Sequence, residues 1–204
     1  IARGLKEKHP HIRSIMGRVH PTVFHKELGK EKYCQMVVRN EGEDAVREIA
    51  RGTLIDKIEN ITWKKQNGEV VVNPDKTEYE DLDKLPFPAY HKIPMNKYHS
   101  ALGAAVRHPS IGLVTSRGCP GKCTFCVSGM FGAKTRFVSP EKILNQIYYL
   151  KKNYNIKEIS FYDYTFTVNR KRIKRLCDKM MSEKLKIKWS CFSRLDTINP
   201  ELLK

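Results

Sequence analysis

Long apolar runs are absent from the sequence, so we expect no membrane-spanning helix in it. No stretch of the 204 residues approaches the length that crosses a membrane. A charged and then apolar leader is also missing from the start of the chain. The first residue is Ile1 rather than Met, so we expect a piece of a longer protein. Hydrophobic residues make up 40% of the chain, which is enough to build a packed core.

Cysteine is scarce, and its distribution is uneven. The chain has six cysteines, and only Cys34 precedes the group that begins at Cys119. Without a secretory leader, this usage favours a reducing compartment, where thiols bind metals or stay unoxidised. We therefore expect a cytoplasmic protein.

Acidic residues are also few. The chain has 22 aspartates and glutamates against 38 lysines and arginines, which gives a net charge of +16. A basic surface of this size attracts polyanions such as RNA. The basic residues are spread along the whole chain, however, and no aromatic-rich basic platform accompanies them. We interpret them mainly as solvated faces of Lys-rich helices, and nucleic acid is a less favoured partner.

The most informative stretch runs from Ser116 to Cys126 and reads Ser-Arg-Gly-Cys-Pro-Gly-Lys-Cys-Thr-Phe-Cys. Its thiols have the spacing C-x3-C-x2-C, and soft sulfur ligands select zinc, copper(I) or iron-sulfur clusters. Three thiolates on a 4Fe–4S cluster leave one iron open for another ligand. A structural zinc site needs four ligands, commonly as two separated pairs, and the chain has no second C-x2-C. The spacing thus favours a cluster held by Cys119, Cys123 and Cys126.

This loop resembles the cluster-binding signature of the radical S-adenosylmethionine (SAM) enzymes, C-x3-C-x-aromatic-C, with Phe125 as the aromatic residue. The resemblance implies that the open iron chelates the amino and carboxylate groups of SAM. One electron then cleaves the sulfonium to methionine and a 5′-deoxyadenosyl radical. It also implies that the Phe125 backbone lies by the adenine, and that a reductant such as flavodoxin or ferredoxin supplies the electron.

Residues 1–52 are predicted to be the C-terminal part of a Rossmann-like domain. Apolar runs at residues 12–16 and 34–38 are typical of buried strands. Apolar positions at helical spacing follow between residues 45 and 50, and Gly52 marks the expected helix end. The order strand, connection, strand, helix favours an open α/β sheet.

The same segment resembles the end of the cobalamin-binding domain that precedes the barrel in many radical SAM enzymes. The matching text is Gly17-Arg18-Val19-His20-Pro21-Thr22 and, later, Arg39-Asn40-Glu41-Gly42-Glu43. Two features depart from the family pattern. Arg18 replaces the second glycine of a pair, and the Asp-x-His-x-x-Gly motif with the cobalt-ligating histidine does not occur. The resemblance makes cobalamin a candidate cofactor of the parent protein, whereas the two departures count against its binding by this chain.

Residues 53–107 are predicted to be a hairpin and a linker. Asn67-Gly68 separates two β-prone runs, which is a strong hairpin signal. The later segment at 81–89 contains two prolines that preclude regular helix, and it resembles the connector of the same family.

Residues 108–204 are predicted to form the first half of a partial (β/α) barrel. Strands are expected at 111–115, 157–161 and 188–194, with helices beginning after Ser139 and Asn169. Asp163 and Arg194 each follow a strand, and the resemblance implies that they contact SAM. Alternatively, Asp163 ends a strand or caps a turn, and Arg194 forms an ion pair with Asp196 or Asp163.

Two other functions compete with SAM cleavage on an unknown substrate. One is an RNA-modifying enzyme of the methylthiotransferase type, whose relatives carry a second cluster on three upstream cysteines. Only Cys34 lies upstream here, which counts against it. The other is a noncatalytic iron-sulfur or zinc module. The sequence identifies neither the substrate nor a catalytic residue.

Overall fold

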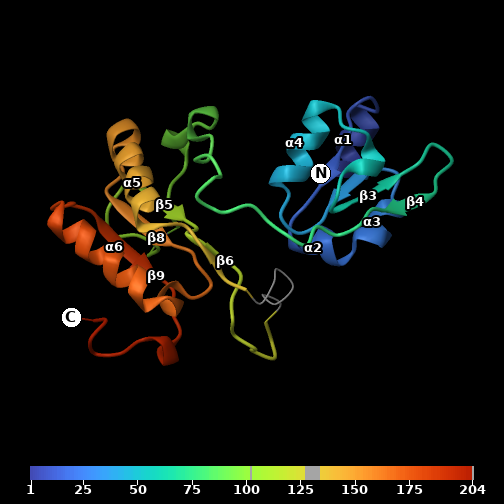
Figure 1. Cartoon of the computed structure of the whole chain (residues 1–204). Coiled ribbons are helices and arrows are strands. Elements are labelled where there is room, and N and C mark those ends of the chain that lie inside the picture. Colours follow the sequence, from blue (N-terminus) through green and yellow to red (C-terminus); the bar gives the residue numbers. More distant parts are fainter. Residues whose placement is uncertain (102, 127–133, 204) are drawn as a thin grey trace. The chain divides into compact units, whose positions relative to one another are not determined.

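The computed structural model describes residues 1–101, 103–126 and 134–203 (Figure 1). The chain divides into two compact units, unit 1 (Ile1–Tyr79) and unit 2 (Glu80–Lys204). Each unit has its own hydrophobic core. Among the residues that the structure describes, no helix has both the length and the apolar character needed to span a bilayer.

Unit 1 is a four-stranded sheet with short helices, and its strands follow the order β1-β2-β3-β4. Its elements are α1 (Ala2–Lys8), β1 (Ile15–Met16), α2 (Val19–Val23), α3 (His25–Lys30), β2 (Met36–Val38), α4 (Glu43–Arg51), β3 (Ile61–Lys64) and β4 (Val70–Val72). The pair β1 and β2 is parallel, and the other two pairs are antiparallel. The predicted strands at 12–16 and 34–38 are thus confirmed in shortened form.

The hairpin around Asn67-Gly68 is confirmed, with Gly68 at a φ of +87°. Its two strands are not a separate ribbon. They extend the sheet of unit 1, because β3 pairs along β2 through residues 61–63. The apolar residue Ile61 is fully buried, so this pairing also serves the core of unit 1.

Arg39 is a buried residue that stabilises unit 1 from within. Its guanidinium donates to the Ile61 carbonyl at 2.7 Å and to Thr62 Oγ1 at 2.6 Å. It also donates to the Asn73 carbonyl and to Asp75 Oδ1 at 2.6 and 2.8 Å. A buried charge needs such partners, and these contacts connect the end of β2 to the strands β3 and β4.

Unit 2 alternates strands and helices, with a parallel three-stranded sheet in the order β5-β8-β9. Its elements are β5 (Ser110–Leu113), β6 (Ser116–Arg117), β7 (Arg136–Phe137), α5 (Pro140–Tyr154), β8 (Glu158–Phe161), α6 (Arg170–Ser182) and β9 (Lys188–Cys191). The mixed α/β class is therefore confirmed. The finer assignment to part of a Rossmann-like domain and part of a barrel stays a prediction, as does the predicted division into three domains.

The core of unit 2 lies between the sheet and its two helices (Figure 1). Ile159 and Phe161 of β8 contribute from the sheet, and α5 and α6 contribute Ile147, Leu150 and Leu176. Each strand delivers the segment that follows it to the same edge, because parallel strands end on the same side. The cysteine loop, Asp163 and Arg194 are therefore brought to one edge of the sheet.

Candidate metal-cluster site

The cysteine loop begins directly after β5. Ser116 and Arg117 form the short strand β6, which pairs antiparallel with β7 where the chain returns. Gly118 follows with a φ of +83°, a conformation that side chains other than glycine rarely adopt. This reversal turns the chain toward Cys119, as expected for a loop that wraps around a ligand.

Two of the three predicted ligands face the same small space. Cys119 is buried and Cys123 is half-buried, and both are free thiols. A methyl group placed on Gly121 would lie 3.4 Å from Cys119 Sγ and 3.8 Å from Cys123 Sγ. The Gly121 amide also donates to Cys119 Sγ at 3.4 Å. A side chain at position 121 would therefore contact both sulfurs, and Arg194 as well.

The third predicted ligand, Cys126, is exposed. Its amide donates to the Cys123 carbonyl at 3.1 Å, so the backbone turns back between the two cysteines. Within the described parts of the chain, no three metal-ligating side chains converge. The three-cysteine ligand set therefore stays a prediction. The chemistry of the donors fits a sulfur-ligated cluster, because two thiols lie near one glycine and soft sulfur ligands favour such clusters.

Asp163 is 2% exposed, and hydrogen bonds hold its carboxylate in place. Oδ1 accepts from the amides of Thr115 and Ser116 at 2.5 and 2.9 Å. Oδ2 accepts from Thr115 Oγ1 at 2.5 Å. Asp163 thus fixes the start of the cysteine loop, which favours the alternative structural role. Its contact with SAM stays a prediction.

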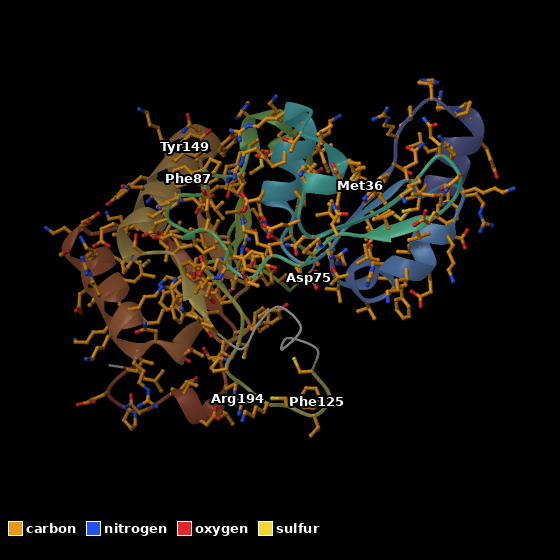
Figure 2. All side chains as sticks on the ribbon, turned by 45° about the vertical axis from the view of Figure 1, so that its right-hand side comes forward. Met36, Asp75, Phe87, Phe125, Tyr149 and Arg194 are labelled. Atoms are coloured by element: carbon orange, nitrogen blue, oxygen red, sulfur yellow. The ribbon has the colours of Figure 1, made fainter. Side chains whose placement is uncertain are left out.

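Arg194 lies beside the cysteine loop (Figure 2). Its Nη1 donates to Cys123 Sγ at 2.8 Å. Its Nε and Nη2 donate to the two carboxylate oxygens of Asp196 at 3.0 and 2.7 Å, which confirms the predicted ion pair. This hydrogen-bonded pair raises the pKa of Arg194 above its ordinary value. The Asp196 carboxylate therefore orients a permanent positive charge next to Cys123.

Phe125 is 90% exposed, and it lies on the same loop (Figure 2). The contact of its backbone with adenine stays a prediction.

Sequence reasoning missed Arg172, which lies on α6 and is 7% exposed. Its Nε donates to the Val138 carbonyl at 2.9 Å, and its Nη2 donates to the carbonyl and Oγ1 of Thr115 at 2.9 and 2.7 Å. Burial lowers the pKa of Arg172, and the Asp163 carboxylate opposes this effect. One sequence signal existed: Arg172 precedes Leu176 by four residues and so shares the buried face of the helix.

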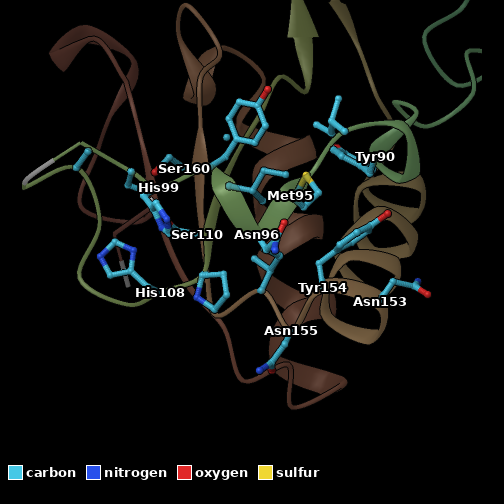
Figure 3. Close-up of a pocket in the computed structure, with 18 of the residues that line it drawn as sticks. Tyr90, Met95, Asn96, His99, His108, Ser110, Asn153, Tyr154, Asn155 and Ser160 are labelled. Carbon is cyan, nitrogen blue, oxygen red and sulfur yellow. Dashed lines mark hydrogen bonds between the residues drawn. The ribbon is translucent and has the colours of Figure 1, made fainter.

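A separate cavity of about 990 Å³ lies in unit 2 (Figure 3). Ser110 and Gly112 of β5, Ser160 and Tyr162 line it from the sheet. Tyr154 at the end of α5 and the adjoining Asn155 line it as well, so the cavity extends from the sheet to the C-terminal end of that helix. It reaches the beginning of β5, whereas the cysteine loop follows the end of that strand.

Comparison with known proteins gives concordant matches. Residues 113–204 match the radical SAM superfamily. The chain is 34% identical to an uncharacterized methyltransferase, PH0819, of Pyrococcus horikoshii, over 100% of this chain and 44% of that protein. It is 27% identical to the anaerobic magnesium-protoporphyrin IX monomethyl ester cyclase of Rubrivivax gelatinosus, over 95% of this chain and 36% of the cyclase.

Among solved structures, the cobalamin-dependent SAM radical enzyme OxsB with aqua-cobalamin bound is similar to this fold. The TM-score is 0.70 at 26% identity, and the match covers 92% of this chain and 27% of OxsB. The chain thus spans less than half the length of each of these three proteins.

Proposed function

Because the chain belongs to the radical SAM superfamily, we propose that unit 2 holds a 4Fe–4S cluster on Cys119, Cys123 and Cys126 and cleaves SAM reductively. When bound, such a cluster supplies the electron that splits the sulfonium into methionine and a 5′-deoxyadenosyl radical. The observation that carries this proposal is the position of Gly121, which lies close to the sulfurs of two of the three predicted ligands. The substrate that loses a hydrogen atom to the radical is unknown.

In this proposal, the chain's own residues bind and orient SAM. Arg194 contacts the SAM carboxylate, because a planar guanidinium suits that geometry and Asp196 already holds it in place. The Phe125 backbone lies by the adenine. Asp163 is the candidate for the SAM amino group, although its two oxygens already accept three hydrogen bonds. Arg194 and Asp163 thus rank as binding residues to be tested, and Arg194 comes first.

Anaerobic reconstitution of the chain with iron and sulfide tests the assignment. We expect about four irons per chain, a reduced-state EPR signal that changes when SAM is added, and 5′-deoxyadenosine after dithionite reduction. Cys123→Ala should lose all three. Cys177→Ala is the matched control, because Cys177 packs against the core of unit 2 and should leave them unchanged.

The competing functions give different results in the same experiment. Bound zinc, or a cluster whose EPR signal ignores SAM, would identify a noncatalytic module and contradict the proposal. A methylthiotransferase would require a second cluster and so about eight irons per parent protein. A cytoplasmic location and an electron donor such as flavodoxin or ferredoxin are expectations that follow from the proposed reaction.

We further propose that the parent protein uses cobalamin, as the OxsB structure does, for methyl transfer or related radical chemistry. One feature of unit 1 supports this. Arg18 has a φ of +80° and a ψ of −166°, a backbone conformation that belongs almost exclusively to glycine. The turn after β1 thus has a backbone shape that suits the glycine of the family pattern, although it carries an arginine.

Binding of aqua-cobalamin to the chain, followed by its visible spectrum, tests this second proposal. Arg18→Gly removes the bulky side chain and keeps the backbone shape, so we expect it to bind cobalamin more tightly than the unmodified chain. Equal and negligible binding by both chains at millimolar cobalamin would contradict the assignment of this turn.

A further inference from the structure

A buried hydrogen-bond network joins the two ends of the cysteine loop. Thr115 lies immediately before the loop and Val138 lies after its return strand β7, and the Val138 amide donates to the Thr115 carbonyl at 2.9 Å. Thr115 is 1% exposed. The side chains of Thr115, Asp163 and Arg172 complete the network, which we term the loop latch.

Asp163 fixes the first end of the loop from β8. Its carboxylate accepts hydrogen bonds from the backbone amides of Thr115 and Ser116 and from the Thr115 hydroxyl. A carboxylate that accepts several hydrogen bonds holds their donors in a fixed arrangement. The direction in which the chain leaves β5 is thereby set.

Arg172 reaches both ends of the loop from α6. Its Nη2 donates to the Thr115 carbonyl and hydroxyl, and its Nε donates to the Val138 carbonyl. The guanidinium also lies 5.2 Å from the centre of the Phe137 ring, on the return strand. A planar group with several donors can hold two chain segments at a fixed separation, which a lysine cannot do.

We propose that Arg172 is a positioning residue for the cluster site: acting through Thr115 and Val138, it fixes the ends of the cysteine loop so that the thiols are presented together. This inference rests on the proposed function, because it assigns a role in holding the same cluster. In the part of the chain that the structure describes, the hydrogen bonds of Arg172 go to Thr115 and Val138 rather than to the predicted ligands. Its effect comes from ordering the loop in advance, which lowers the cost of ordering it when the cluster binds.

The isosteric variant Thr115→Val tests the latch. It keeps the shape of the side chain and removes the hydroxyl that lies between Asp163 and Arg172. Mutation of groups that hydrogen-bond metal ligands typically costs about 10- to 100-fold in metal affinity, and Thr115 acts at one further contact from the thiols, so the lower end of this range applies. We therefore expect the reconstituted variant to lose iron to a chelator about 10-fold faster than the unmodified chain.

Two control variants separate the latch from general loss of stability. Thr62→Val makes the same change at a fully buried threonine of unit 1, whose hydroxyl accepts from the buried Arg39. Glu158→Gln alters a buried acid at the opposite end of β8, where it accepts from the Val106 and Arg107 amides. We expect both controls to release iron at the unmodified rate.

Substitution of Arg172 itself gives a graded readout. We expect Arg172→Lys to release iron at a rate between those of the unmodified chain and Arg172→Gln, and the fraction of damaged three-iron cluster in the EPR spectrum to rise in the same order. If these variants fail to fold, hydrogen exchange of the unmodified apo chain still tests the latch. The Thr115 and Ser116 amides should exchange slowly, and fast exchange of both overturns the inference.

The outcomes distinguish the latch from the proposed function. A cluster that binds SAM, with equal iron release in Thr115→Val and Thr62→Val, overturns the latch alone. Equal acceleration in Glu158→Gln and Thr115→Val also overturns it, because loss of stability would then explain the effect. An unmodified chain that assembles no iron-sulfur cluster overturns the latch and the proposed function together.

Discussion

Replacement of Asp163 by asparagine distinguishes a structural role from a SAM contact. The asparagine oxygen can still accept from the Thr115 and Ser116 amides. Its NH2 group, however, would face the Thr115 hydroxyl that now donates to Oδ2, and that hydroxyl would lose its acceptor. The buried Arg172 would also lose the carboxylate charge that most favours its own charged form. One hydrogen bond to a charged group is worth about 1.5–3 kcal/mol, and the loss of a favourable charge near a buried cation adds to this cost.

We therefore expect Asp163→Asn to lower the unfolding free energy of unit 2 by about 3 kcal/mol. The two tryptophans make this measurable, because Trp63 lies in unit 1 and Trp189 in unit 2. In a Trp63→Phe background, urea unfolding of the apo chain followed by Trp189 fluorescence reports on unit 2 alone. A loss below about 1 kcal/mol, together with weaker SAM binding by the reconstituted variant, would refute the structural account and favour the direct contact.

Three further predictions concern the loop and unit 1. Gly118→Ala forces a side chain into a left-handed conformation, and we expect it to cost about 1–2 kcal/mol in the thermal unfolding of apo unit 2; an unchanged melting temperature would contradict the observed turn. Gly121→Ala has no such strain, so apo stability should stay within about 0.5 kcal/mol of the unmodified chain. Iron incorporation should fall, because the added methyl lies beside both sulfurs. Full incorporation would show that the cluster does not bind beside Gly121. Burial, and then the positive charge of Arg39, lower the pKa of His25 below 6.5. The folded state therefore binds fewer protons than the unfolded state, and unit 1 should lose stability as the pH falls below about 6.5. His25→Gln should abolish this contribution, and an identical pH dependence of urea unfolding in both chains would count against it.

Features that depend on neighbouring residues could be predicted from the sequence. Ser139 caps α5 by accepting from the Lys142 amide at 3.2 Å, and Asn169 caps α6 by accepting from the Arg172 amide at 3.0 Å. The Asn67-Gly68 hairpin formed for the same reason, because its turn chemistry is local. Hydrophobic periodicity also located the three parallel strands of unit 2.

Features that depend on distant partners could not be predicted. Asp163 and Thr115 are 48 residues apart, and Arg172 and Thr115 are 57 apart. Sequence spacing cannot show that a carboxylate at the end of one strand accepts hydrogen bonds from backbone amides in the turn that follows another strand. The predicted strand at 12–16 was too long for a similar reason, because only Ile15 and Met16 find partners on β2.

In the proposed site, three thiols hold a four-iron cluster whose remaining iron is open to SAM. Mössbauer spectroscopy of the chain reconstituted with iron-57 tests it most directly, because it distinguishes one iron from the other three. We predict that the signal of about one quarter of the iron shifts when SAM is added, while the rest stays unchanged. Four irons that remain equivalent with and without SAM would contradict the claim.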